Sequence, residues 1–144
     1  MKDKFEFIDH TADILFRCEA GSLERLFVQA GLAIGETTTR LNTIEEIEER
    51  LITGKNKNLE YLLFDFLDDL LFYKDAELLI FKKFEIKINK EGSEEYELTC
   101  KAIGEKLQEG KHERTIDIKA ITMHMFEVKE VSSEKWSCQV LVDI

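Results

Sequence analysis

The stretch NLEYLLFDFLDDLLFYKDAE, residues 58–77, decides how this chain folds. Its apolar residues recur every three or four positions, which is typical of the buried face of an α-helix: Leu59, Leu62, Leu63, Phe66, Leu67, Leu70 and Tyr73. Asn58 can cap this helix, and Glu60 lies in the first turn, where the helix dipole favours a carboxylate. A helix with so wide an apolar face needs a sheet or a second helix to cover it.

The polar face of the same helix carries aromatic residues among its carboxylates. Tyr61, Asp65, Asp68 and Phe72 fall on one line along that face. One interpretation is that a loop folds over the aromatic rings, because single aromatic residues on a surface are common. The other is an exposed surface for a basic protein partner, whose encounter the carboxylates would accelerate.

Length and composition describe one ordered domain. The 144 residues suffice for a sizeable core, so we predict a single domain over residues 1–144. Apolar residues make up 44% and charged residues 35%, which excludes a disordered chain. Twenty basic and thirty acidic residues give a net charge of −10, so the chain repels a phosphate backbone and direct nucleic-acid binding is not expected.

The sequence favours a cytoplasmic protein with no membrane attachment. No apolar run approaches the ~20 residues that a membrane span needs, and the start of the chain has no apolar signal-peptide core. Cys18, Cys100 and Cys138 cannot all pair within one chain, and none forms a C-x-x-C motif. We interpret them as reduced core thiols in a reducing compartment.

Much of the remaining chain alternates between apolar and polar residues, which predicts β-strands. Ser22 can cap another helix over 22–35, whose Gly31 costs about 1 kcal/mol of helix propensity and suggests a close crossing with a neighbour. The segment 43–53 is ambiguous, and we expect a strand in its later part. The clearest strand patterns lie near residues 5–7, 14–18, 84–88, 96–102, 116–120, 124–128 and 136–142.

The order of these elements does not alternate as β-α-β units throughout. After Asp75, the apolar residues recur about every 2 residues instead of every 3.6 residues. We therefore predict an α+β domain in which two helices, over 22–35 and 58–76, pack on one side of a mostly antiparallel or mixed β-sheet.

Two aspartates are candidate metal ligands. By strand parity, Asp13 and Asp143 point away from the apolar faces of their strands, and Ile144 adds a terminal carboxylate if the chain ends there. Such groups repel one another unless a cation or a proton lies among them, and oxygen ligands favour calcium, magnesium or manganese over zinc. The alternative is two unrelated surface aspartates.

Other polar residues are weaker candidates for a functional role. His10 precedes Asp13 by three residues, so the pair could serve as acid and base or as ligands, or His10 could bond to the backbone at a strand break. Lys119 lies on the polar face of its predicted strand, where a solvated charge is the alternative, and His124 is expected to lie half in the core. The chain has no nucleophile-elbow, Walker, dinucleotide or zinc-spaced motif, so nothing indicates an independent catalyst.

Several stretches together resemble the archease family. They are FEFIDHTADILF at 5–16, SLERLFVQAGLAIGETTT at 22–39, NLEYLLFDFLDDLLFYKDAELLIF at 58–81, Gly104-Glu105, Lys111-His112, IDIKAITMHMFEV at 116–128 and VLVDI at 140–144. The similarity covers nearly the whole chain in the family's order. The combination of HTAD, K-A-I-T-x-H and a terminal Asp-Ile is specific.

The resemblance implies a function that the composition does not. Archease proteins are cytosolic accessory factors of the tRNA-splicing RNA ligase: they promote guanylylation of its active-site histidine, allow multiple turnover and broaden its nucleotide use. The family carries a divalent-metal site, with calcium the expected ion, which corresponds here to Asp13, Asp143 and Ile144. Lys119 is a further candidate functional residue, and the acidic stretch 45–50 leaves any functional acid there unassigned.

Two other classes of protein stay open. A stand-alone metal-dependent hydrolase would use Asp13 and Asp143 and would turn over a model phosphoester. A general chaperone-like interaction module would suppress aggregation broadly, without preference for the ligase.

Overall fold

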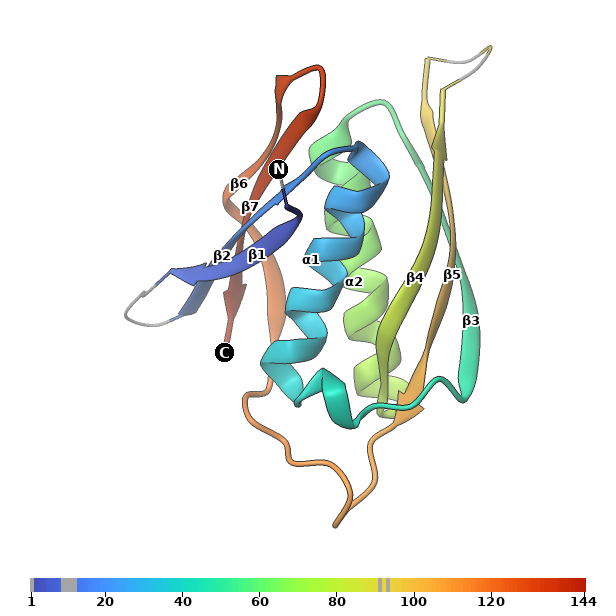
Figure 1. Ribbon diagram of the computed structural model, residues 1–144, viewed down its shortest axis with the longest axis vertical. Coiled ribbons are helices and arrows are strands. Elements are labelled where there is room, and N and C mark those ends of the chain that lie inside the picture. The colour runs from blue at the N-terminus through green and yellow to red at the C-terminus, as the bar shows by residue number, and fades with distance from the viewer. Residues whose placement is uncertain (1, 9–12, 91, 93) are drawn as a thin grey trace.

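Two α-helices lie between two antiparallel β-sheets (Figure 1). The computed structural model describes residues 2–8, 13–90, 92 and 94–144. The helices are α1 (Leu23–Thr38) and α2 (Leu59–Glu77), and a 3-10 turn, η1, covers Leu41–Thr43. Sheet A has the strand order β1-β2-β7-β6, and sheet B has the order β3-β5-β4. Their bounds are β1 Lys4–Ile8, β2 Asp13–Ala20, β3 Glu48–Asn56, β4 Leu79–Asn89, β5 Tyr96–Lys106, β6 Ala120–Ser132 and β7 Lys135–Asp143.

The predicted α+β class, with two helices and antiparallel strands in a single compact domain, is confirmed. The strands divide between two sheets, however, where the sequence pattern predicts one. The reason is that α2 is apolar on two sides. Phe64 meets Phe126 of β6 with ring centres 6.0 Å apart, whereas Phe66 meets Phe84 of β4 at 5.8 Å. A single sheet covers only one side of a helix, so each side of α2 requires its own sheet.

Both helices begin where capping residues predict. The Ser22 hydroxyl accepts a hydrogen bond from the Arg25 N–H at 3.2 Å, and the Asn58 side chain accepts one from the Tyr61 N–H at 3.0 Å. These bonds satisfy N–H groups that have no partner within the helix. Neither helix is both long enough and apolar enough to cross a membrane, within the described part of the chain.

Two glycines permit close contacts between elements. A Cβ at Gly31 would lie 2.8 Å from the Phe84 ring, which confirms the close crossing that this helix position suggests. A Cβ at Gly104 of β5 would lie only 1.9 Å from the Ile80 carbonyl oxygen, where the register between β4 and β5 shifts. Any side chain at Gly104 would therefore push β4 away from β5.

The prediction of a strand over 116–120 is wrong. Residues 107–119 form no strand, and β6 begins only at Ala120. Ala120 pairs with Asp143, the last residue of β7, so sheet A offers no neighbouring strand before that point. The backbone bonds instead to a helix end, as the Thr115 N–H donates to the Thr38 carbonyl at 2.9 Å.

His124 is exposed rather than half-buried. The register between β6 and β7 is irregular between Thr122 and Glu127, and Met125 adopts a left-handed φ of 59°. Such an irregularity breaks the alternation on which strand parity depends. The parity of His124 with Phe126 therefore does not place the two side chains on one face.

All three cysteines are buried and free, as predicted for core thiols. Cys18 and Cys138 are partners across β2 and β7, and their mutual hydrogen bond, together with burial, raises the pKa of Cys18. Burial also raises the pKa of Cys100 to about 12. Thiols with such raised pKa values are poor nucleophiles at neutral pH, so they serve packing rather than chemistry.

Gly104→Ala should destabilise the fold by about 3 kcal/mol, because the added methyl would collide with the backbone of β4. Gly54→Ala is the matched control in the same sheet, since its Cβ would meet Leu62 at an ordinary 3.4 Å. Urea unfolding followed by circular dichroism measures both variants. Equal unfolding midpoints would contradict the tight approach of β4 to β5.

Candidate functional site

Asp13 and Asp143 lie side by side at one end of sheet A. β2 begins at Asp13, β7 ends at Asp143, and the two residues are direct partners in the antiparallel register. Asp13 is half-buried and Asp143 is exposed. The fold therefore brings together two carboxylates that lie near opposite ends of the sequence.

Asp143 also borders the start of β6. It pairs with Ala120, and its carbonyl accepts a hydrogen bond from the Lys119 N–H at 2.8 Å. The Lys119 side chain is exposed and lies just before β6, not within a strand. Ile144, 40% exposed, follows Asp143 directly. His10, the remaining candidate, lies outside the described residues.

A further carboxylate, which the sequence pattern does not reveal, lies near Asp13. Glu36 of α1 and Asp13 line one pocket of about 360 Å³. The Glu36 side chain accepts a hydrogen bond from the Leu41 N–H at 3.0 Å. The pattern ends this helix at Gly35, whereas α1 continues to Thr38 and so directs Glu36 to the pocket. The other lining residues are Phe7, Ile8, Ile14, Thr37, Thr115 and Ile116.

The donors at the end of sheet A fit a hard, partly hydrated cation better than zinc. They are carboxylate oxygens, and the cysteines are buried in the core. Among the described residues, no group of three or more Asp, Glu, His or Cys side chains is placed to hold a metal ion. Asp13 and Asp143 would supply two ligands, and backbone oxygens or water would supply the others. Calcium and magnesium accept such mixed oxygen shells.

A buried lysine holds the segment that leads to this site. Lys74, in the last turn of α2, is only 4% exposed. Its Nζ donates to the Asp117 carboxylate at 2.6 Å and to the Ile118 carbonyl at 2.9 Å, and it forms an ion pair with Asp75 at 3.0 Å. The hydrogen bond from Lys74 lowers the pKa of Asp117. Residues 117–118 are thereby fixed against the end of α2.

Lys74 also acts on Asp143 through the backbone. Ile118 precedes Lys119, whose N–H donates to the Asp143 carbonyl. The sequence offers one signal for this role: Lys74 is the only basic residue in the last turn of an otherwise apolar and acidic helix. A cation there interacts favourably with the helix dipole, so the sequence alone predicts only this role for Lys74. The tertiary contacts show the others.

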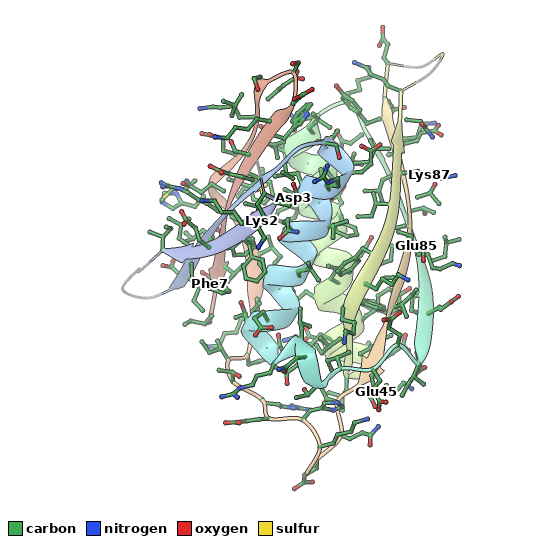
Figure 2. All side chains as sticks on the ribbon, viewed as in Figure 1. Lys2, Asp3, Phe7, Glu45, Glu85 and Lys87 are labelled. Carbon is green, nitrogen blue, oxygen red and sulfur yellow. The ribbon has the colours of Figure 1, made fainter. Side chains whose placement is uncertain are left out.

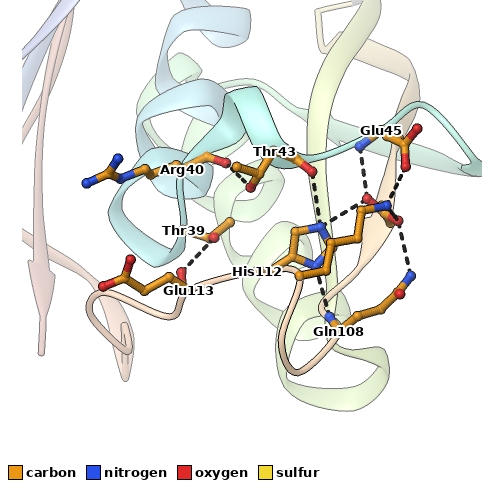
Figure 3. A network of polar contacts seen from close by, with 9 residues as sticks. Thr39, Arg40, Thr43, Glu45, Gln108, His112 and Glu113 are labelled. Atoms are coloured by element: carbon orange, nitrogen blue, oxygen red, sulfur yellow. Dashed lines mark hydrogen bonds and ion pairs between the residues drawn. The ribbon is translucent and has the colours of Figure 1, made fainter.

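Glu105 is a buried carboxylate at the other end of residues 107–119. Figure 3 shows this network of contacts, with its members Glu45, Gln108 and His112 labelled. One of its oxygens accepts a hydrogen bond from the Glu45 N–H at 3.0 Å and lies 3.0 Å from His112 Nε2. The other accepts from Lys111 Nζ at 2.6 Å and from the Gln108 side chain at 3.1 Å. Every lone-pair direction of this carboxylate is therefore engaged, which is what burial of a charge requires.

Both ring nitrogens of His112 have hydrogen-bond partners. Nδ1 accepts the backbone N–H of Gln108 at 2.9 Å, so the proton is assigned to Nε2, which faces Glu105 and the Thr43 carbonyl at 3.1 Å. The ring thus ties residues 107–119 to the chain before β3. The Glu105–His112 pair is enclosed and satisfied, so it fastens this connection instead of presenting a reactive group.

The charges around Glu105 decide its protonation. Burial by itself raises the pKa of this carboxyl, but hydrogen bonds from Lys111 and from the Glu45 backbone outweigh burial, so the pKa lies below its ordinary value. The acidic stretch 45–50 is partly explained by these contacts. Glu45 also forms an ion pair with Lys111, and Glu48 pairs with Arg50 at 3.2 Å.

The aromatic and acidic line on α2 is exposed. Tyr61 is 50% exposed and Phe72 is 61% exposed, so the interpretation in which a loop covers them is wrong. Asp65 and Asp68, between them, are exposed too. We call these four residues the α2 ridge.

Comparison with known proteins identifies the family. The sequence profile of the Archease protein family matches residues 5–144. Protein archease of Pyrococcus abyssi is 38% identical over 141 residues, covering 98% of this chain and 99% of that protein. Protein archease of Methanothermobacter thermautotrophicus is 42% identical over 124 residues, covering 86% and 87%. The chain therefore belongs to the archease family.

Solved structures agree with this fold. The solution structure of a Methanobacterium thermoautotrophicum protein superposes with a TM-score of 0.86 at 38% identity, covering 97% of this chain and 98% of that one. The crystal structure of an archease from Thermotoga maritima, described as a possible chaperone, gives a TM-score of 0.61 at 24% identity, covering 95% and 94%. The second likeness concerns the fold alone.

Glu105→Gln should lower the stability of the fold and should also make that stability less sensitive to acid. Because folding lowers the pKa of Glu105, its carboxylate stabilises the fold above its ordinary pKa of about 4.5, and this contribution is lost as the pH falls through the lower folded-state value. The variant should lose about 2 kcal/mol at pH 7, since Lys111 and His112 lose a charged acceptor. Between pH 5 and pH 3, the free energy of unfolding of the variant should then fall less than that of the wild type.

Urea unfolding at stepped pH measures these profiles. Glu109→Gln is the control, because Glu109 is exposed in the same connection. Parallel stability profiles for the wild type and Glu105→Gln would show that this carboxylate has no role in acid unfolding.

Proposed function

We propose that this protein is an accessory activator of the tRNA-splicing RNA ligase and is not itself an enzyme. In this role it promotes guanylylation of the ligase's active-site histidine, supports multiple turnover and broadens the nucleotides that the ligase accepts. Membership of the archease family over nearly the whole chain supports the proposal. The protein acts in the cytoplasm on a protein partner, and its net charge of −10 disfavours direct contact with RNA.

The observation that carries the proposal is the pairing of Asp13 with Asp143 across β2 and β7. Two carboxylates on adjacent strands repel one another. A divalent cation would compensate these charges. We infer that Asp13, Asp143 and the Ile144 carboxylate would hold it, with calcium the first expectation and magnesium or manganese the alternatives.

The protein's own residues would position such an ion for a partner. The β2–β7 register sets the spacing of the two aspartates, and the Lys119 N–H anchors the backbone of Asp143. A bound cation supplies positive charge that can stabilise a phosphate oxygen. Lys119, exposed beside the same strand end, would add a second positive charge near this site.

Added in substoichiometric amounts, the protein should raise the number of ligations that each molecule of a cognate RNA ligase completes. The physical reason is that an activator which leaves the ligase after each guanylylation can serve many ligase molecules. Single-turnover and multiple-turnover rates, with and without the protein, measure the effect. Unchanged rates in both regimes would refute the proposal.

Two controls separate the competing functions. A stand-alone hydrolase would turn over a model phosphoester in the absence of ligase. A general chaperone would protect an unrelated aggregating enzyme, such as citrate synthase, as effectively as it serves the ligase.

Asp13→Asn should weaken divalent-cation binding at least tenfold and reduce ligase activation, because it removes a charge and keeps the side-chain shape. Extending the chain beyond Ile144 should have the same effect by removing the terminal carboxylate. Glu134→Gln, at the β6–β7 turn, is the control carboxylate and should bind cations like the wild type. Calorimetry with calcium, magnesium and manganese measures the affinity. Equal binding of all three ions by wild type and Asp13→Asn, or no binding by either, would exclude this site.

A further inference from the structure

The α2 ridge lies on the open side of the molecule between the two sheets. α2 packs against β3 and β6, which are edge strands of sheets B and A, whereas α1 packs mainly against β4 and β2. The ridge is the part of the α2 circumference that neither sheet covers. The buried part comprises Leu62, Leu63, Phe66, Leu67, Leu70, Leu71 and Lys74.

The carboxylates of the ridge have no compensating charge of their own. Within the described ranges, no basic side chain forms an ion pair with Asp65, Asp68 or the adjoining Asp69. By contrast, Asp117 on the neighbouring surface is paired with Lys74. Partial desolvation of the two carboxyl groups raises the pKa values of Asp65 and Asp69, and the negative charge of Asp68 raises both further. Cationic groups of a partner would relieve this repulsion.

Aromatic side chains bracket these carboxylates. Tyr61 and Phe72 lie eleven residues apart, which corresponds to about 16 Å along a helix. Exposed aromatic residues are typical anchors of protein interfaces, and charges between them set the orientation and rate of encounter. RNA is a poor occupant, since its phosphates would meet unpaired carboxylates on a chain of net charge −10.

We propose that the α2 ridge docks against a surface rich in lysine and arginine on the RNA ligase. This inference rests on the proposed function, because an enzyme that handles RNA presents basic side chains to phosphates. Asp65 and Asp68 accelerate the encounter, and Tyr61 and Phe72 slow dissociation by burying apolar surface. The ridge is thus separate from the cation site in both residues and role.

The fold connects the ridge to the candidate cation site. α2 packs against β6, and β6 pairs with β7, the strand that ends at Asp143. Two residues beyond Phe72, Lys74 holds Ile118, and the next residue, Lys119, bonds to Asp143. A partner docked on the ridge would therefore bind the helix that packs against β6, and β7 is the next strand after β6 in the sheet.

The test measures association of the purified cognate ligase by stopped-flow. Asp65→Lys/Asp68→Lys should slow association at least about fivefold at ~20 mM salt, and by less than about twofold at ~500 mM, where ions screen the charges. Glu85→Lys/Glu97→Lys is the matched control, because both glutamates are exposed on sheet B and the change in net charge is equal. Figure 2 shows Glu85 pointing away from the helices. This control should stay within about twofold of the wild type at either salt concentration.

Further variants separate docking from activation. Tyr61→Ser/Phe72→Ser should raise the dissociation rate about tenfold and leave the association rate nearly unchanged. Asp13→Asn should associate like the wild type and yet activate the ligase less. Asp65→Lys/Asp68→Lys should activate fully once its concentration saturates the ligase.

Each outcome decides between the ridge and the proposed function. If the wild type binds the ligase and the ridge variants match it and the sheet B control, the ridge is not the docking surface and the proposed function stands. If the two charge-reversal variants slow association equally, net charge alone acts and the ridge is again excluded. If the wild type does not bind the ligase at any salt concentration, both proposals fall.

Discussion

The burial of α2 on two sides is the constraint on which the rest of the structure depends. Its apolar side chains, including Leu63 and Leu67 with no exposed surface, face sheets on either side. Burying each such leucine contributes roughly 2 kcal/mol, so exposing either side of the helix would be costly. Two sheets are the consequence, and the chain must therefore cross from one sheet to the other. The uncovered strip of α2 faces solvent, and it is this strip that carries the ridge.

The crossing over residues 107–119 is held by charges where the rest of the fold is held by apolar packing. Glu105 fastens its beginning and Lys74 fastens its end, and both side chains are almost fully buried. Buried charges are unfavourable unless they are fully bonded, so each has several partners. This requirement gives the connection one path, because a shifted chain would leave a buried charge unpaired. The path delivers Lys119 to Asp143 and so shapes the candidate cation site.

The two proposed functional surfaces differ in the physical property that they use. The α2 ridge offers unpaired charge and exposed aromatic surface on a rigid helix, which suits recognition of a partner. The strand end with Asp13 and Asp143 offers oxygen ligands held by a β-ladder, which suits a hard cation. A partner that binds both surfaces would be oriented by the α2 ridge and would meet the cation held at the strand end. The sheet A strand β6 lies between them, so their relative position is set by the packed core.

The sequence by itself determined the two helices, their caps and the antiparallel strands, because periodicity and capping depend on neighbouring residues. It also singled out Asp13 and Asp143 by parity, and the family by the motifs around them. Only the tertiary structure decided that these aspartates are register partners, that the strands form two sheets, and that residues 107–119 form no strand. The position of Glu36 at the pocket near Asp13 was also decided by the tertiary structure, because the helix that carries it ends later than the local pattern predicts. These features arise from contacts between distant residues, in which burial and pairing override local preference.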